Sequence, residues 1–179
     1  KNISMSNGEL HCSGISASAL AAEFKTPTFF LDEDDFRTRA FNWNTELSNA
    51  FGSQAGRVYY AAKAFICVGV ARWIADLGIG IDVCTGGELA VALAGGIDPQ
   101  KIEVHGNNKS VSEIEKAISV GVESIVIDSM YEIDRVAAAA SKAGKVQRVH
   151  LRLTPGIQAH THESISTAHE DVKFGFSIA

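Results

Sequence analysis

Five ionisable residues each end a short apolar run of the sequence, a position from which parallel strands present side chains to ligands. They are Lys63, Asp82, His105, Asp128 and Arg152. Lys63 is flanked by alanines and a phenylalanine, with no charged residue next to it in sequence. Burial there would disfavour the charged ammonium form, and a neutral lysine amine attacks carbonyl groups to form a Schiff base. The competing interpretation is a lysine that extends its ammonium group into water at the strand end.

The other four residues also have ordinary structural interpretations. Asp128 directly precedes Ser129 and could support the start of a helix, where aspartate is favoured. His105 could be a turn histidine whose hydrogen bonds are satisfied. Asp82 and Arg152 could form a structural ion pair, which is the commoner fate of buried charges. The residue types alone therefore leave the structural and the functional interpretations open.

A histidine-rich segment follows the last of these residues. His160 and His162 form an H-x-H pattern that could bind zinc in a metal-dependent hydrolase, and His169 comes shortly afterwards. We expect no tightly bound metal, because these histidines are predicted to lie on a loop rather than on a rigid scaffold. Gly86 and Gly87 precede a helical pattern and could hold a phosphate, but the sequence contains no nucleotide-binding glycine fingerprint.

The elements that must position these residues recur with a regular period. Five short runs rich in β-branched residues start 22, 22, 23 and 23 residues apart, at 57–62, 79–83, 101–105, 124–128 and 147–151. Helical patterns fill the gaps, and this alternation predicts βα units and a parallel sheet. Side chains alternate between the two faces of a strand, so the ionisable set should lie opposite the aliphatic residues. The latter include Val58, Ile81, Val83, Val104 and Ile127.

Helix boundaries are marked at both ends. The capping pattern S/T-x-x-E, in which a hydroxyl and a carboxylate each accept a hydrogen bond from a free backbone N–H, starts at Thr85, Ser110 and Ser129. Glycines suited to the left-handed position after a helix stand at Gly78, Gly121 and Gly144. Upstream, the patterns predict a short helix over 16–24, a strand over 26–31 and a long helix from the acidic residues 32–35 to Gly52. The first ten residues carry little signal.

Composition excludes several classes of protein. The chain has 179 residues, of which 46% are hydrophobic and 21% charged. Its 16 basic and 21 acidic residues give a net charge of −5, which disfavours nucleic acid or a membrane surface as partner. The longest apolar run is far below the roughly 18 residues of a membrane span. Three cysteines without a C-x-x-C pattern, and an N-terminus without an apolar stretch, favour a cytoplasmic location.

Several blocks of the sequence together resemble one family, the diaminopimelate decarboxylases, and in particular its actinobacterial branch. The blocks are YAAKAF at 60–65, IDVCTGGEL at 81–89, HGNNKS at 105–110, LRLTPG at 151–156 and the segment 159–175. The resemblance extends from about residue 26 to residue 179. It implies a homodimeric pyridoxal 5'-phosphate enzyme that converts meso-2,6-diaminopimelate to L-lysine and CO2. Lys63 matches the lysine that holds the cofactor as an aldimine, and Asp82 and Arg152 match polar neighbours of the cofactor.

The implied fold is a (β/α)8 barrel accompanied by a second, β-rich domain. By this resemblance, residues 1–31 form an N-terminal segment with a strand of the β-rich domain, and residues 32–179 form the first part of the barrel. Only about five βα units are predicted, whereas such a barrel has eight and typically about 250 residues. We therefore expect the chain to correspond to about half of the enzyme and to be inactive alone.

Two alternatives remain beside this interpretation and the metal-dependent hydrolase. One is another barrel-type pyridoxal-phosphate decarboxylase that acts on a different amino acid. The other is a non-enzymatic, doubly wound five-stranded domain that binds a small ligand or a partner. Strand order separates the last of these from a barrel: sequential neighbours indicate barrel-type winding, and the order 2-1-3-4-5 indicates a doubly wound sheet.

Overall fold

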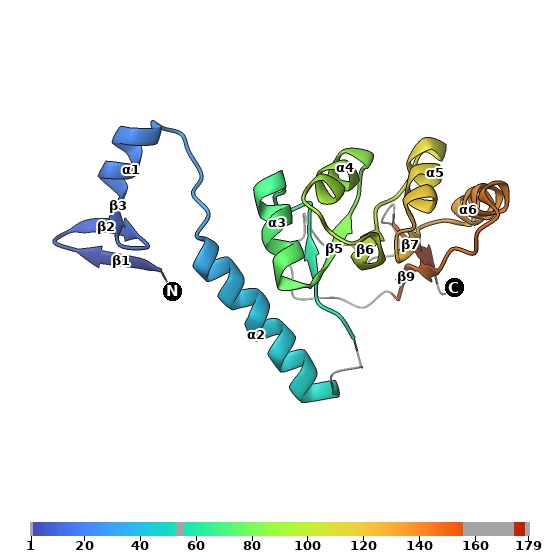
Figure 1. The fold of residues 1–179 in the computed structure, drawn as a ribbon, viewed down its shortest axis with the longest axis horizontal. Coiled ribbons are helices and arrows are strands. Elements are labelled where there is room, and N and C mark those ends of the chain that lie inside the picture. The colour runs from blue at the N-terminus through green and yellow to red at the C-terminus, as the bar shows by residue number, and fades with distance from the viewer. Residues whose placement is uncertain (1, 53–55, 156–173, 178–179) are drawn as a thin grey trace. The chain divides into compact units, whose positions relative to one another are not determined.

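The structure is a computed structural model that describes residues 2–52, 56–155 and 174–177 (Figure 1). The chain divides into two compact units, Lys1–Val58 and Tyr59–Ala179. The first contains a three-stranded sheet and the second a five-stranded sheet. Among the described residues no helix is long and apolar enough to cross a membrane. The domain division predicted after residue 31 stays a prediction.

The first unit begins with a small antiparallel sheet in the order β1-β2-β3. Its strands are Ile3–Ser6, Glu9–Cys12 and Ile15–Ser16. Sequence patterns missed this sheet, although Asn7 and Gly8 form a dipeptide typical of tight hairpin turns. Both residues have positive φ values in the structure, 51° and 77°, as such a turn requires.

The two helices of the first unit confirm the sequence prediction. The side chain of Ser16 caps α1 (Ala17–Phe24), and Asp32 Oδ1 accepts a hydrogen bond from the backbone N–H of Asp35 at the start of α2 (Glu33–Phe51). The strand predicted over 26–31 is wrong, since this segment is irregular. A strand needs a neighbouring backbone to satisfy its polar groups, and no described strand pairs with these residues.

The second unit alternates strand and helix, as predicted. Its main elements are β4 (Tyr59–Ala61), α3 (Val68–Leu77), β5 (Gly80–Val83), α4 (Gly86–Ala94), β6 (Ile102–Val104), α5 (Val111–Val120), β7 (Ser124–Ile127), α6 (Met130–Ala143) and β8 (Val149–Leu151). A short 3-10 turn (Pro99–Lys101) precedes β6. Two further short strands, β9 (Leu153–Thr154) and β10 (Phe176–Ser177), pair in parallel with each other.

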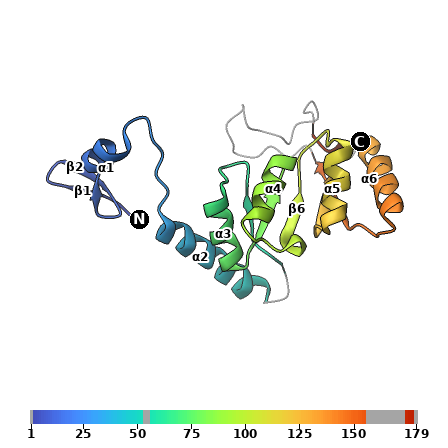
Figure 2. The ribbon, with the colours of Figure 1, turned by 45° about the horizontal axis from the view of Figure 1, so that its top comes forward.

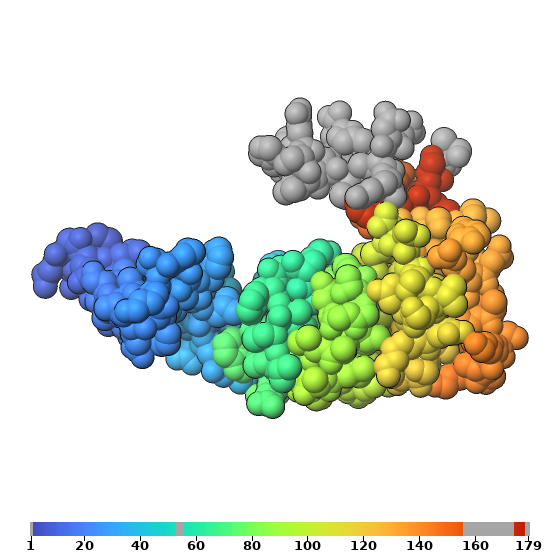
Figure 3. All heavy atoms as spheres, turned by 90° about the horizontal axis from the view of Figure 1, so that it is seen from above, coloured from blue at the N-terminus to red at the C-terminus, as the bar shows by residue number. Residues whose placement is uncertain are grey.

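The five strands of the main sheet lie in the sequential order β4-β5-β6-β7-β8, and each neighbouring pair is parallel. Helices α3 to α6 lie side by side along one face of this sheet (Figure 2). In the space-filling view their atoms follow one another in chain order along the unit (Figure 3). Sequential winding of this kind is that of an incomplete (β/α)8 barrel, and it excludes the doubly wound order.

The core lies between the sheet and its helices. Of the aliphatic residues predicted to lie opposite the ionisable set, Ile81, Val83, Val104 and Ile127 are buried. Val58 is only partly buried, because it precedes β4 rather than lying within the sheet. Helix residues that meet them include Ile74, Leu89, Ile114, Ile118 and Val136, which are buried as well. Burial of each such aliphatic side chain contributes about 1.5–3 kcal/mol. The period-two alternation of the strands therefore leaves the opposite face of the sheet to the polar residues.

The predicted helix ends are confirmed, but the predicted helix starts are confirmed only in part. Gly78, Gly121 and Gly144 all have left-handed conformations after their helices. Ser110 forms a complete capping box with Glu113. At Ser129 the predicted capping hydrogen bond is absent. There the expected partner, Glu132, turns inward to a buried lysine instead, because that lysine needs a counter-charge.

Candidate active site

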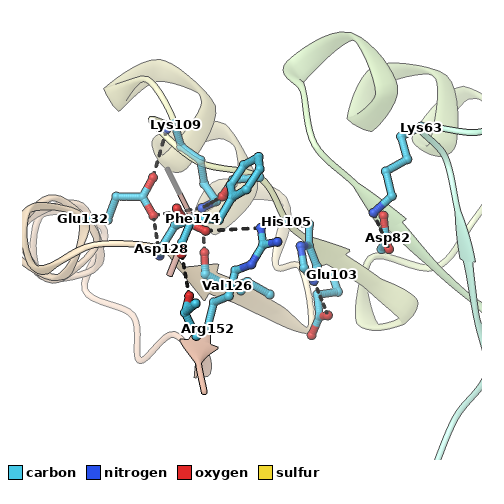
Figure 4. Close-up of polar contacts among 12 residues, drawn as sticks. Lys63, Asp82, Glu103, His105, Lys109, Val126, Asp128, Glu132, Arg152 and Phe174 are labelled. Carbon is cyan, nitrogen blue, oxygen red and sulfur yellow. Dashed lines mark hydrogen bonds and ion pairs between the residues drawn. The ribbon is translucent and has the colours of Figure 1, made fainter. Parts of the chain in front are cut away.

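Lys63 follows β4 at the edge of the sheet where the strands end. Its side chain is 59% exposed, and its Nζ lies 3.8 Å from Oδ2 of Asp82, which is on the neighbouring strand β5 (Figure 4). Of the two interpretations left open, this exposure agrees with a lysine that extends its amine into water at the strand end, and the Asp82 carboxylate is a counter-charge that local sequence did not indicate. Register explains the pairing, since Ala61 lies opposite Asp82 and Lys63 follows Ala61 by two residues. The amine is accessible to a ligand that approaches the strand ends.

Asp82 offers a second feature suited to a ligand. Its side chain is only 16% exposed, and its Oδ1 is buried without a hydrogen-bond partner among the described residues. Buried acceptors of this kind are rare in folded proteins, and each calls for a partner that supplies a donor. Burial of the nearby Cys84 thiol raises its pKa, and the negative charge of Asp82 is the second largest cause of this increase. A carboxylate with one unpartnered oxygen thus lies next to the exposed lysine amine.

His105 directly follows β6 and lies on the same face of the sheet as Asp82, since Asp82 pairs with Glu103 two residues earlier. Its Nε2 lies 3.8 Å from Oε1 of Glu103. Burial lowers the pKa of His105, and the negative charges of Asp82 and Glu103 offset this effect only in part. The neutral imidazole is therefore favoured near pH 7, and it can donate one hydrogen bond and accept another.

Arg152 and Asp128 form an ion pair at the same edge of the sheet, directly after strands β8 and β7. The Nη1 of Arg152 lies 3.4 Å from Oδ1 of Asp128, whose side chain is buried. The guanidinium also stacks on the ring of Phe174, 4.3 Å from its centroid. The alternative ion pair between Arg152 and Asp82 is wrong, because β6 and β7 separate the strands that carry them. Asp128 holds Arg152 rather than the start of the next helix.

Sequence reasoning missed two groups of polar residues next to this site. Glu103 Oε2 accepts a hydrogen bond from Ser124 Oγ and lies 2.6 Å from Nδ1 of His150. Behind the edge, Lys109 and Glu132 form a buried ion pair. The available signal for Glu103 was its position between Ile102 and Val104, which places it on the polar face. For the buried pair, local sequence contained no signal, because its partners are 23 residues apart.

No group of three or more metal-binding side chains lies close enough to hold an ion in the described part of the chain. The histidines His160, His162 and His169 lie outside the described residues. The prediction that they bind no metal tightly therefore stays a prediction.

Comparisons with known proteins agree with the geometry at the strand ends. Residues 33–179 match the family described as "Pyridoxal-dependent decarboxylase, pyridoxal binding domain". The chain is 57% identical over 172 residues to diaminopimelate decarboxylase of Mycobacterium tuberculosis, covering 96% of this chain and 37% of that protein. It is 51% identical over 180 residues to the Mycobacterium leprae protein of the same name, covering 100% of this chain and 37% of that protein.

A solved structure shows the same fold. Diaminopimelate decarboxylase from M. jannaschii in complex with L-lysine superposes with a TM-score of 0.84 at 29% identity, covering 99% of this chain and 42% of that one. The chain spans about 37% of the length of the curated relatives it matches. Since the family match covers most of the chain and includes all five strand ends, this chain belongs to the pyridoxal-dependent decarboxylases and carries sequence of their pyridoxal-binding domain.

Proposed function

We propose that the complete protein is a diaminopimelate decarboxylase that converts meso-2,6-diaminopimelate to L-lysine and CO2. The observation that carries this proposal is the 57% identity to such an enzyme over nearly the whole chain, joined to an accessible lysine amine beside a buried carboxylate. Two alternative activities have weaker support. The curated relatives named above are diaminopimelate decarboxylases, which disfavours a decarboxylase for a different amino acid, and the family match disfavours a metal-dependent hydrolase.

The residues at the strand ends fit pyridoxal 5'-phosphate. Lys63 supplies an accessible primary amine for the aldehyde of the cofactor. Asp82 supplies a buried oxygen that lacks a donor, and Arg152 supplies a cation whose position Asp128 and Phe174 hold. When bound, pyridoxal phosphate provides an electron sink for the electron pair that remains after CO2 departs.

The chain's own residues have three tasks in this proposal. Lys63 would hold the cofactor through its accessible side-chain amine. Asp82 places its carboxylate 3.8 Å from the lysine Nζ, where its unpartnered Oδ1 can accept a hydrogen bond from a ligand. Arg152, held by Asp128 and Phe174, presents its guanidinium group at the opposite side of the site.

The remaining features of the proposal concern the protein as a whole. Following the family resemblance, the complete protein forms a homodimer, residues 1–31 belong with a β-rich domain, and residues 32–179 belong with the barrel. A cytoplasmic location without nucleic-acid or membrane partners is supported by the net charge of −5. Size-exclusion chromatography with light scattering tests the dimer.

Substrate comparison tests the activity. The purified complete protein, supplied with pyridoxal phosphate, is incubated separately with meso-2,6-diaminopimelate, L-ornithine, L-lysine and L-arginine, and CO2 release is measured. We expect CO2 and L-lysine from diaminopimelate, and rates of CO2 release from the other three amino acids that are lower by orders of magnitude. Faster release from any of those three would assign a different decarboxylase. Cofactor binding without turnover of any of the four would contradict the proposed reaction.

A further inference from the structure

A buried ion pair lies directly behind the strand ends of the candidate site. The Nζ of Lys109 is 2.9 Å from Oε2 of Glu132, and both side chains are only 2% exposed. Lys109 stands in the loop between β6 and α5, whereas Glu132 is in the first turn of α6. The pair therefore joins two consecutive βα connections (Figure 4).

Within the described part of the chain, the two charged groups form hydrogen bonds to each other and to backbone atoms of these connections. The Nζ of Lys109 donates to the carbonyl oxygens of Gly106 and Val126, each at 2.6 Å. Glu132 Oε1 accepts from the backbone N–H of Lys109, and its Oε2 accepts from the backbone N–H of Asp128, both at 3.0 Å. Four backbone groups at the ends of β6 and β7 are thus tied to one ion pair.

These backbone groups adjoin the residues proposed to face the cofactor. Gly106 follows His105 and packs closely against the chain after β5. Any side chain at this position would place its Cβ 3.3 Å from the carbonyl oxygen of Cys84. Asp128 carries the carboxylate that holds Arg152. Displacement of the pair would therefore move the supports of both His105 and Arg152.

Stability alone is a poor reason for such a pair. The free-energy cost of removing two charges from water offsets most of their mutual attraction. Well-packed apolar residues at the same positions often stabilise a core as much as the ion pair or more. Helices α5 and α6 also carry an exposed ion pair. The Nζ of Lys142 on α6 lies 2.7 Å from Oε1 of Glu115 on α5. That pair links the two helices with side chains 75% and 40% exposed, so it provides a matched control.

We propose that Lys109 and Glu132 form a positioning pair that holds the β6–α5 loop and the β7–α6 junction in the geometry that the cofactor site requires. Neither residue touches the cofactor in this proposal; both act through His105, Asp128 and Arg152. The inference rests on the proposed cofactor-binding function for its effect on affinity. Its structural part, the anchoring of two backbone segments, applies to the protein without cofactor as well.

The test uses the double variant Lys109→Met, Glu132→Gln in the complete protein. This variant removes both charges together, so no unpaired charge is left buried, and glutamine keeps one acceptor for a backbone N–H. Hydrogen–deuterium exchange is measured without cofactor on peptides that cover the β6–α5 loop and the β7–α6 junction. Pyridoxal phosphate affinity is measured by titration of its visible absorption band. The control is Lys142→Met, Glu115→Gln.

We expect the double variant to fold, with exchange in both segments faster by about tenfold or more while the rest of α5 stays protected. We expect cofactor affinity to fall about tenfold, the effect common when supports of a ligating group are removed. The control variant should match the wild type in both measurements. Unchanged exchange and affinity in the folded double variant, or equal changes in the control, would overturn the inference.

A second variant covers the case in which the double variant does not fold. Arg135 is half-buried, and its Nη1 donates to the backbone carbonyl of Lys109 at 2.9 Å. Arg135→Gln removes this outer support and leaves the buried pair in place. Faster exchange in the β6–α5 loop at an almost unchanged melting temperature supports the inference, and unchanged exchange contradicts it. Because exchange requires no cofactor, failure of the wild type to bind pyridoxal phosphate would reject the proposed function alone.

Discussion

Asp128 and Arg152 are direct neighbours across two parallel strands, with Arg152 Nη1 3.4 Å from Asp128 Oδ1. They follow the register pair Ile127 and Leu151, the last paired residues of β7 and β8. The Asp128 side chain is buried and the guanidinium of Arg152 stacks on Phe174. The carboxylate therefore fixes where a positive charge is presented at the edge of the sheet.

Substitution Asp128→Asn should weaken this arrangement. The amide keeps the shape but loses the charge, so Arg152 loses its ionic partner. We expect a loss of about 1–3 kcal/mol in the free energy of unfolding, together with weaker binding of pyridoxal phosphate. Urea denaturation and cofactor titration measure the two effects. Asp134→Asn, at an exposed position of α6, is the control and should leave both unchanged; equal losses in the two variants would argue against the pair.

Substitution Lys63→Arg should separate cofactor attachment from folding. Arginine keeps the positive charge near Asp82, but its guanidinium is a poor nucleophile because it stays protonated. We expect decarboxylation to fall by orders of magnitude with the melting temperature almost unchanged. After borohydride reduction of the wild type, mass spectrometry should find the cofactor on the peptide that contains Lys63. Recovery of the label on Lys109 or Lys173 instead would disprove the assignment.

The reactivity of Cys84 should report the charge of Asp82. Burial first, and then the negative charge of Asp82, raise the pKa of the Cys84 thiol. Since the thiolate is the reactive form, we expect slower alkylation by iodoacetamide at pH 8 for Cys84 than for the exposed Cys67. Asp82→Asn should speed the reaction of Cys84 and leave that of Cys67 unchanged. An unchanged rate at Cys84 would mean that the two groups do not interact electrostatically.

His105 should make stability depend on pH. Burial lowers its pKa in the folded protein below the ordinary value of 6.5. Between that lowered pKa and about 6.5, the unfolded chain binds more protons at this site, so stability falls as pH decreases through the window. Melting temperatures from pH 7.5 to 5 should therefore decline less in His105→Gln than in the wild type. His11→Gln is the control, and an equal decline in His105→Gln and the wild type would refute the prediction.

A polypeptide limited to these 179 residues should associate and should lack decarboxylase activity. An apolar groove of about 270 Å³ lies between α6 and the outer strand β8, lined by residues that include Ile133, Val136 and Val149. Leu151 and Leu153 are exposed beside it, and such surfaces and strand edges favour self-association. Light scattering should find oligomers or aggregates. A monodisperse monomer of 19.1 kDa or turnover of diaminopimelate would contradict this expectation.

Local sequence signals were sufficient for the elements of the second unit and for the face on which the site lies. These signals act over only a few residues, so their effect can be predicted from neighbouring positions in the sequence. They include the β-branched runs, the complete capping box at Ser110 and the glycine at Gly121. Parallel strands bring their carboxyl ends to one edge, and for this reason the five ionisable residues could be expected to gather there. The order of the strands was left open between two folds.

Tertiary structure decided which charges pair. Lys63 meets Asp82 because β4 lies beside β5, and Arg152 meets Asp128 because β8 lies beside β7. Glu132 does not cap the helix start as predicted, because the buried Lys109 requires a counter-charge. These choices depend on strand register and burial, which arise from contacts more than 15 residues apart in the chain. Local sequence determined where each polar side chain points, and only the assembled sheet determined which partner it finds there.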